Sequence, residues 1–268
     1  MCGLSTLPSA HIRPDRRQKA TVSPTLPCCT LFLMHTPFFG EFMGTLILVL
    51  LGNGVVAAVL LKGSKAENAG WMCITAGWAF AVVCGVLTAI ACGSPDAHLN
   101  PAVTLAASIK SGDFSNVLTF IAAQLLGATA GAVLVWLHYL PHWEPTVDPS
   151  LKLGCFSTAP AIRSPGANFI AEAIGTFVLC FVVFVLGSKA LNVSFAPPLV
   201  GMLVWSIGLS LGGPTGYAIN PARDLGPRIA YTFLPIPGKK GSDWGYALVP
   251  ILGPCAGAVA AAVLAKNL

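Results

Sequence analysis

Long apolar stretches separated by short polar segments dominate the chain from residue 38 onward. A helix needs about 20 mostly apolar residues to span a membrane. Six stretches are candidates for such spans, at residues 38–61, 71–92, 116–140, 167–187, 196–211 and 244–265. The pattern therefore predicts an all-α membrane protein with six transmembrane helices.

Two further apolar stretches, residues 100–109 and 220–234, are too short to span a membrane. Asparagine favours the cap before a helix and proline favours the first helical position, so an Asn-Pro pair predicts a helix start. Both stretches begin with such a pair, within the triplets Asn100-Pro101-Ala102 and Asn220-Pro221-Ala222. We expect two re-entrant half-helices, which persist at membrane depth only where protein or water surrounds them.

The chain also repeats itself. The string Glu-Phe-Met-Gly-Thr at residues 41–45 returns as Glu-Ala-Ile-Gly-Thr at residues 172–176, and residues 98–103 return as residues 218–223. Three spans per half is an odd number, so the second half must insert upside down, which is an inverted 3+3 repeat with its site near the midplane. We divide a single channel domain, residues 34–268, into repeat one (38–140), a connecting loop (141–166) and repeat two (167–268).

Residues 1–33 differ from the rest, with four basic residues and four prolines. They lack the long apolar core of a signal peptide. We expect either a disordered tail or an over-extended start, with Met34 as the natural first residue.

The composition agrees with a membrane protein, because only 9% of the 268 residues are charged against about 25% in soluble domains. The net charge of +5 is spread along the chain, and without a basic stripe we expect no nucleic-acid partner. The nine cysteines have no haem, zinc or iron–sulfur spacing, so we expect no metal and no cofactor. No nucleophile–base constellation suggests an enzyme.

Charged residues inside the apolar segments are candidates for function. Arg223 lies one turn into the second half-helix, where a charge costs ~3 kcal/mol or more and usually marks a pathway. The alternative is a buried ion pair with Asp224. Glu41 and Glu172 are equivalent carboxylates that suit a proton relay, or acceptors for the backbone of the re-entrant loops. We favour the second interpretation because the pair follows the repeat.

The strings at residues 97–104 and 215–224 closely resemble the aquaporin (major intrinsic protein) family, and the resemblance covers roughly residues 38–268. It implies a homotetramer of channels in a lipid bilayer. Asp224 directly after Arg223, and the long stretch of residues 212–217, look like the glycerol-facilitator branch of bacterial type. Residues 93–96 form a longer approach to the first motif than is usual in the family, which bears on the inner mouth.

The resemblance also implies a selectivity filter made of Trp78, Gly208, Tyr217 and Arg223. Facilitators commonly have phenylalanine where this chain has Tyr217, whose hydroxyl would narrow the filter or add a hydrogen bond. Gly208 would leave room for a solute where water-only channels carry histidine. Trp78 has an alternative as an interfacial tryptophan. Further residues would line or support the pore, and His98 alternatively is a plain loop histidine: His98, Leu99, Asp224, Glu41 and Glu172.

We therefore expect a passive channel for glycerol and other small uncharged solutes, with water. Asn100 and Asn220 would offer amide hydrogens to the solute, and the two positive helix ends would repel protons and cations. A water-selective aquaporin is the alternative, followed by a secondary transporter, which would need an acidic coupling-ion site. We expect a bacterial inner membrane and cytoplasmic termini, although the loop charges do not decide the orientation.

Overall fold

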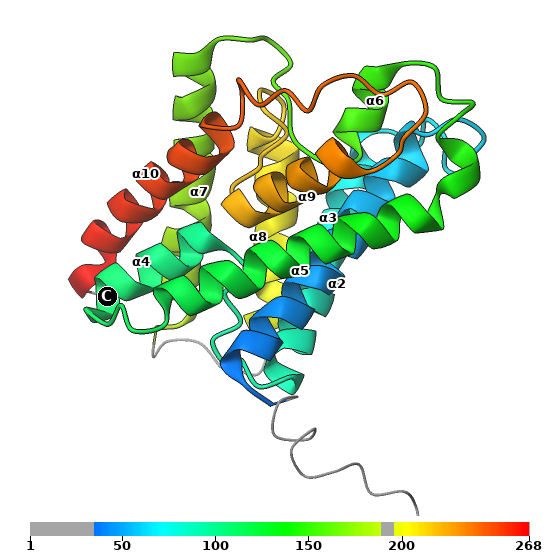
Figure 1. Ribbon diagram of the computed structural model, residues 1–268. Helices are drawn as coiled ribbons and strands as arrows, with labels where there is room; N and C mark the ends of the chain where they lie inside the picture. The colour runs from blue at the N-terminus through cyan, green and yellow to red at the C-terminus, as the bar shows by residue number, and fades with distance from the viewer. Residues whose placement is uncertain (1–34, 189–195, 268) are drawn as a thin grey trace, which may run out of the picture.

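The computed structural model describes residues 35–188 and 196–267, so the prediction for residues 1–33 lies outside the described residues. The described elements are helices (Figure 1). Repeat one contains α2 (Pro37–Leu60), α3 (Trp71–Ala91), α4 (Pro101–Ser111) and α5 (Val117–His138). Repeat two contains α7 (Pro165–Leu186), α8 (Ala196–Leu211), α9 (Pro221–Phe233) and α10 (Val249–Leu264). The predicted series of six spans and two half-helices is confirmed.

Two of the six spans are shorter than the others. Helices α2, α3, α5 and α7 are long and apolar enough to cross a membrane, whereas α8 and α10 have 16 residues each. The sixth span was predicted to start at Trp244 but begins at Val249, which corrects its boundary. Residues 244–248 form turns, preceded by Asp243 in a left-handed conformation with φ of 49°.

The connecting segment holds structure that the sequence did not predict. A 3-10 turn, η1 (Leu140–His142), is followed by the short helix α6 (Pro149–Gly154). Outside this segment, a second 3-10 turn, η3 (Ala265–Asn267), follows α10. Helix α6 starts with Asp148 as its cap and Pro149 at its first position. A polar cap followed by proline is the same kind of signal that predicted the half-helices, and here it begins a helix of six residues.

The two repeats exchange their half-helices. Helix α2 packs on α3 and α5, and α7 packs on α10 and α8, as the repeat requires. Helix α4, however, packs on α10 of the second repeat, and α9 packs on α5 of the first. Figure 1 shows α4 and α9 between the longer helices, running outward from the middle of the molecule. The exchange brings both half-helix starts into one central region.

Close helix crossings explain why glycine recurs in the last helix of each repeat. A Cβ atom on Gly127 of α5 would lie 2.2 Å from the carbonyl oxygen of Phe42 on α2. A Cβ atom on Gly257 of α10 would lie 2.1 Å from the carbonyl oxygen of Ala173 on α7. Small residues at such positions let membrane helices approach closely. Gly127 and Gly257 therefore allow the close packing of α5 on α2 and of α10 on α7, and the half-helices pack on α5 and α10.

Candidate functional site

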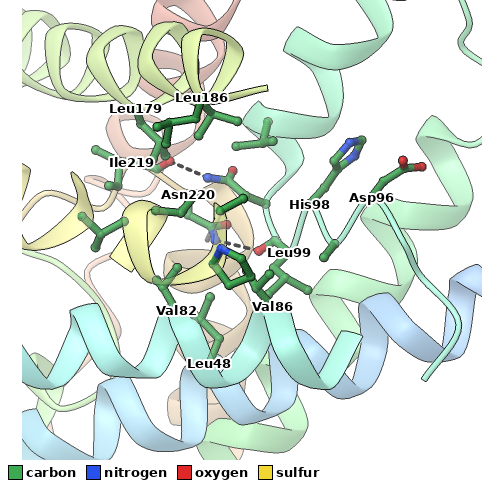
Figure 2. A pocket seen from close by; sticks show the side chains of 18 of the residues that line it. Leu48, Val82, Val86, Asp96, His98, Leu99, Leu179, Leu186, Ile219 and Asn220 are labelled. Atoms are coloured by element: carbon green, nitrogen blue, oxygen red, sulfur yellow. Dashed lines mark hydrogen bonds between the residues drawn. The ribbon is translucent and has the colours of Figure 1, made fainter. Parts of the chain in front are cut away.

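A cavity of about 580 Å³ lies between the two repeats and borders both half-helix starts. Arg223, Trp78 and Tyr217 are among its lining residues, and so are Asp96 and His98 of the loop before α4. Figure 2 shows apolar side chains along the wall, with Leu48, Val82 and Val86 from α2 and α3, and Leu179 and Leu186 from α7. The cavity therefore combines an apolar wall with polar lining residues from both repeats.

The two asparagines before the half-helices are bonded to each other's loops. Asn100 Nδ2 donates to the carbonyl oxygen of Ile219 at 2.8 Å, and Asn220 Nδ2 donates to that of Leu99 at 2.8 Å (Figure 2). Each Oδ1 atom caps its own helix, by accepting from the backbone N–H two residues later. An amide nitrogen has two hydrogens, so each asparagine keeps one N–H that the described residues do not use.

The predicted helix starts are confirmed, and both face the same region. Pro101 and Pro221 occupy the first position of α4 and α9, directly after the asparagine caps. Ala102 and Ala222 follow, and both are fully buried. Each helix start carries about half a positive charge. Two such ends that meet in one cavity make it unfavourable for a cation.

The loops before the half-helices have the same strained backbone. Ala97 and Leu99 have φ of 44° and 52°, and the equivalent Tyr217 and Ile219 have φ of 37° and 43°. Non-glycine residues adopt this region rarely, at a cost of about 1–3 kcal/mol each unless the surroundings hold them. Both repeats therefore contain the same strained loop, and contacts with the surrounding residues must hold each loop in this conformation.

Buried carboxylates provide these contacts. Glu41 is fully buried and accepts hydrogen bonds from the backbone N–H groups of His98 and Leu99, at 2.8 and 2.7 Å. Ser94 Oγ and Gln124 Nε2 also donate to it, at 2.8 and 2.7 Å. Ser94 and Gln124 were not among the residues predicted to line or support the pore.

Glu172 occupies the equivalent place in the second repeat. It accepts from the backbone N–H groups of Ala218 and Ile219, at 2.9 and 2.8 Å. Its side chain is 1% exposed. Both carboxylates thus hold the loop of their own repeat, which is the arrangement that the acceptor interpretation predicts.

Arg223 and Trp78 lie together at the cavity. The guanidinium carbon of Arg223 lies 4.2 Å from the centroid of the Trp78 ring, a cation–π contact. Trp78 is buried at 4% exposure, whereas Trp71 at the start of α3 is 42% exposed. The interfacial interpretation therefore suits Trp71 rather than Trp78. Arg223 Nη1 is buried and has no hydrogen-bond partner among the described residues.

Asp224 does not pair with Arg223, so that alternative is wrong. Its oxygens accept from Arg228 Nε at 2.8 Å and Arg228 Nη2 at 3.0 Å. The backbone N–H and the hydroxyl of Thr158 also donate to it, both at 2.7 Å. Asp224 faces away from the cavity because it follows Arg223 directly on the helix. It ties α9 to the connecting segment instead.

The space beside Gly208 is occupied, which corrects the expectation that it leaves room for a solute. A Cβ atom on Gly208 would lie 2.9 Å from Cζ of Tyr217 and 3.0 Å from the Thr75 methyl carbon. Tyr217 lines the cavity, and Gly208 lies behind it. Glycine at this position makes room for the tyrosine ring.

His98 borders the main cavity and also a second one of about 260 Å³. Its Nδ1 atom lies 3.2 Å from Thr104 Oγ1, and its ring packs edge-on against Phe120. Within residues 35–188 and 196–267, no group of three or more His, Cys, Asp or Glu side chains is arranged to hold a metal ion.

Known proteins are similar to this chain in sequence and in fold. The model of the major intrinsic protein family matches residues 32–265. The chain is 54% identical over 228 residues to a probable glycerol uptake facilitator protein of Thermotoga maritima, covering 85% of this chain and 97% of that protein. It is 51% identical over 225 residues to the glycerol uptake facilitator protein of Bacillus subtilis, covering 83% and 81%.

Among solved structures, the chain resembles the aquaglyceroporin from Plasmodium falciparum. The TM-score is 0.74 and the sequence identity is 29%, over 86% of this chain and 95% of that one. The structural similarity therefore extends over most of this chain.

Proposed function

Since the chain belongs to the major intrinsic protein family, we propose that its cavity is a passive channel for glycerol and other small uncharged solutes, together with water. The relatives at 51–54% identity are named glycerol uptake facilitators, which supports this solute class. The observation that carries the proposal is the meeting of Asn100 and Asn220 in one cavity with an apolar wall.

A polyol has hydroxyl groups along one edge and carbon atoms along the other, and the cavity offers a partner to each. Arg223 Nη1 and the unused amide hydrogens of Asn100 and Asn220 would donate to the hydroxyl oxygens. Trp78, with Leu48 and Val82 of the apolar wall, would contact the carbon edge. We assign Trp78, Tyr217 and Arg223 to the selectivity filter, with Gly208 as the residue that accommodates Tyr217.

Ions would be excluded by charge rather than by size alone. A cation that enters the cavity meets the guanidinium of Arg223 and then the positive ends of α4 and α9. Half-helix ends of this kind form an electrostatic barrier in channels. Glu41, Glu172 and Asp224 do not line the cavity, and the charge of Asp224 is balanced by Arg228.

The protein is an integral membrane protein of a family of channels and facilitators, not of enzymes. We propose that it lies in a bacterial inner membrane with both termini in the cytoplasm and that it assembles as a homotetramer. Residues 34–268 would form the channel domain, with Leu99 and His98 lining the pore before the first half-helix.

A water-selective channel is the second candidate, because Tyr217 fills the space beside Gly208 that would otherwise be open to a solute. A secondary transporter has less support, since Glu41 and Glu172 are held by backbone amides and have no free role as a coupling-ion site.

Stopped-flow measurements on proteoliposomes test the proposal. Vesicles with the protein should equilibrate glycerol faster than empty vesicles, and water as well. A rise in water permeability alone would favour the water-selective candidate. Accumulation of glycerol against its gradient would contradict a passive channel.

A further inference from the structure

The second cavity, of about 260 Å³, adjoins the main one at the loop before α4. Its lining residues come from that loop, from α4 and from the start of α5. Asp96, His98 and Ala107 border both cavities. Figure 2 shows the Asp96 and His98 side chains on the same side of their loop, turned away from Asn220. The second cavity therefore lies beside the proposed passage, away from the two asparagines.

Two carboxylates border the second cavity, and no lysine or arginine of the described residues does. Asp96 belongs to none of the ion pairs in the described part of the chain. Asp113 accepts one hydrogen bond at Oδ1, from the Ser115 backbone N–H at 2.9 Å, so Oδ2 stays available. Lys110, in the last turn of α4, lies 4.8 Å from the centroid of the Phe184 ring instead.

The helix ends at this cavity do not offset the two negative charges. Ser111 at the end of α4 and Val117 at the start of α5 both border it. A helix end carries about half a charge, negative at the last turn and positive at the first. The two contributions cancel, and the carboxylates dominate. The cavity therefore favours a cation.

His98 adds a neutral acceptor to the carboxylates. Its Nδ1 atom lies 3.2 Å from Thr104 Oγ1. The single hydroxyl hydrogen of Thr104 goes to the carbonyl oxygen of Asn100 at 3.1 Å, and Gln124 Nε2 donates to Thr104 Oγ1 at 3.0 Å. Nδ1 is therefore the donor to Thr104, and Nε2 of the neutral ring is an acceptor.

A buried hydroxyl group also faces the second cavity. Thr104, Ser108 and Ser111 follow one another at intervals of four and three residues, so they lie on one face of α4, and all three border the cavity. Ser108 is only 7% exposed, and its hydroxyl makes no hydrogen bond with the described residues. A buried polar group without a partner is costly, so this position suits a ligand that hydrogen-bonds.

The acceptors are spread around the cavity. Among the described residues, no three His, Cys, Asp or Glu side chains gather closely enough to hold a metal ion. A ligand that satisfies them needs N–H donors on separate atoms. We propose that the second cavity is a binding site for small aliphatic diamines. One ammonium group meets Asp96 and His98, the other meets Asp113, and Ser108 is a further acceptor. The site goes beyond the proposed channel function and does not depend on the solute conducted.

Isothermal titration calorimetry tests the proposal on the purified full-length protein in a neutral detergent at low salt. At pH 8 an alkylammonium group, with a pKa of about 10, is charged, whereas a histidine with a pKa of about 6.5 is neutral. We expect 1,4-diaminobutane to bind saturably with one site per chain. The neutral analogue 1,4-butanediol should not bind, and 1-aminobutane should bind more weakly. Equal heats from 1,4-diaminobutane and from sodium chloride of the same ionic strength would overturn the proposal.

Variants of the lining residues locate the site. We expect Asp96→Asn and Asp113→Asn each to weaken binding of 1,4-diaminobutane about fivefold, the equivalent of about 1 kcal/mol. Ser108→Ala should weaken it by a smaller factor. Glu144→Gln is the matched control, because Glu144 is an exposed carboxylate outside the residues that line the cavity. An equal loss in Glu144→Gln would show attraction to general surface charge and overturn the proposal. Unfolding temperatures without ligand identify the variants that keep the wild-type fold.

Two further measurements separate the alternatives. Magnesium chloride that binds more tightly than 1,4-diaminobutane, with the same dependence on Asp96 and Asp113, would replace the diamine site with a metal site. Glycerol flux into proteoliposomes is measured independently. Protein that binds the diamine but does not conduct glycerol would contradict only the proposed function, and protein that conducts glycerol but does not bind the diamine would overturn only this inference.

Discussion

Asp224 and Arg228 form a buried ion pair within α9, in which both carboxylate oxygens accept from the guanidinium group at 2.8 and 3.0 Å. Arg228 also donates to the carbonyl oxygens of Ser242 and Thr158. The pair therefore anchors the second half-helix to two separate segments. Since Arg228 balances the charge of Asp224, Asp224 does not compete with the cavity for the Arg223 side chain.

Loss of this ion pair should destabilise the protein strongly. Asp224→Asn removes the charge that Arg228 faces, and breaking a buried pair costs about 3–5 kcal/mol. We expect a clear fall in the thermal unfolding temperature in detergent. Glu67→Gln is the control, because the pair of Glu67 with Lys62 lies at the surface, with Lys62 65% exposed, and surface ion pairs contribute little to stability. Equal shifts for the two variants would contradict the anchoring role.

Glu41→Gln should weaken the first re-entrant loop. The amide keeps one acceptor oxygen and presents an NH₂ group to N–H donors that the carboxylate now satisfies. We expect a loss of several kcal/mol in stability, and glycerol and water fluxes that fall together. A variant of unchanged stability that alters only proton movement would support the proton-relay interpretation instead.

Arg223→Val should raise proton or cation leak. The substitution removes the charge over the Trp78 ring and leaves the two helix ends as the barrier. Conductance across planar bilayers measures the change, and Arg223→Lys is the matched variant because it keeps the charge. If Arg223→Val conducts no more ions than the wild-type protein, the half-helix ends suffice alone.

Gly208→His should reduce glycerol flux far more than water flux, because any side chain at this position displaces Tyr217. Gly208→Ala is the smaller change and should move the ring in the same way. Addition of Tyr217→Ala to Gly208→Ala removes the clash, so the double variant should conduct glycerol better than Gly208→Ala alone. Equal losses of water and glycerol in Gly208→His would argue against the filter assignment.

Local sequence signals predicted the parts of the site that depend on backbone chemistry. The Asn-Pro pairs marked the starts of α4 and α9 because a cap and a first-turn proline act within a few residues. The repeat paired Glu41 with Glu172, and both hold the loops of their own halves. These features needed no knowledge of distant contacts.

Side-chain partners across long separations were not predictable in the same way. The Asp224–Arg228 pair itself is local and follows from the i,i+4 spacing on one face of α9, but the hydrogen bond from Arg228 to the Thr158 carbonyl oxygen spans 70 residues. Tyr217 fills the space beside Gly208 because the loop and α8 meet only in the folded protein. The start of α10 shifted because an apolar run does not distinguish turns from helix at residues 244–248.

The hydrogen bond from Asn100 to Ile219 has a consequence for biosynthesis. The two residues are 119 positions apart, which a ribosome covers in roughly 6–24 s at about 5–20 residues per second. During that interval the first half-helix lacks both its amide partner and its packing surface on α10. A nascent chain therefore cannot complete the packing around its first half-helix until α10 has been made.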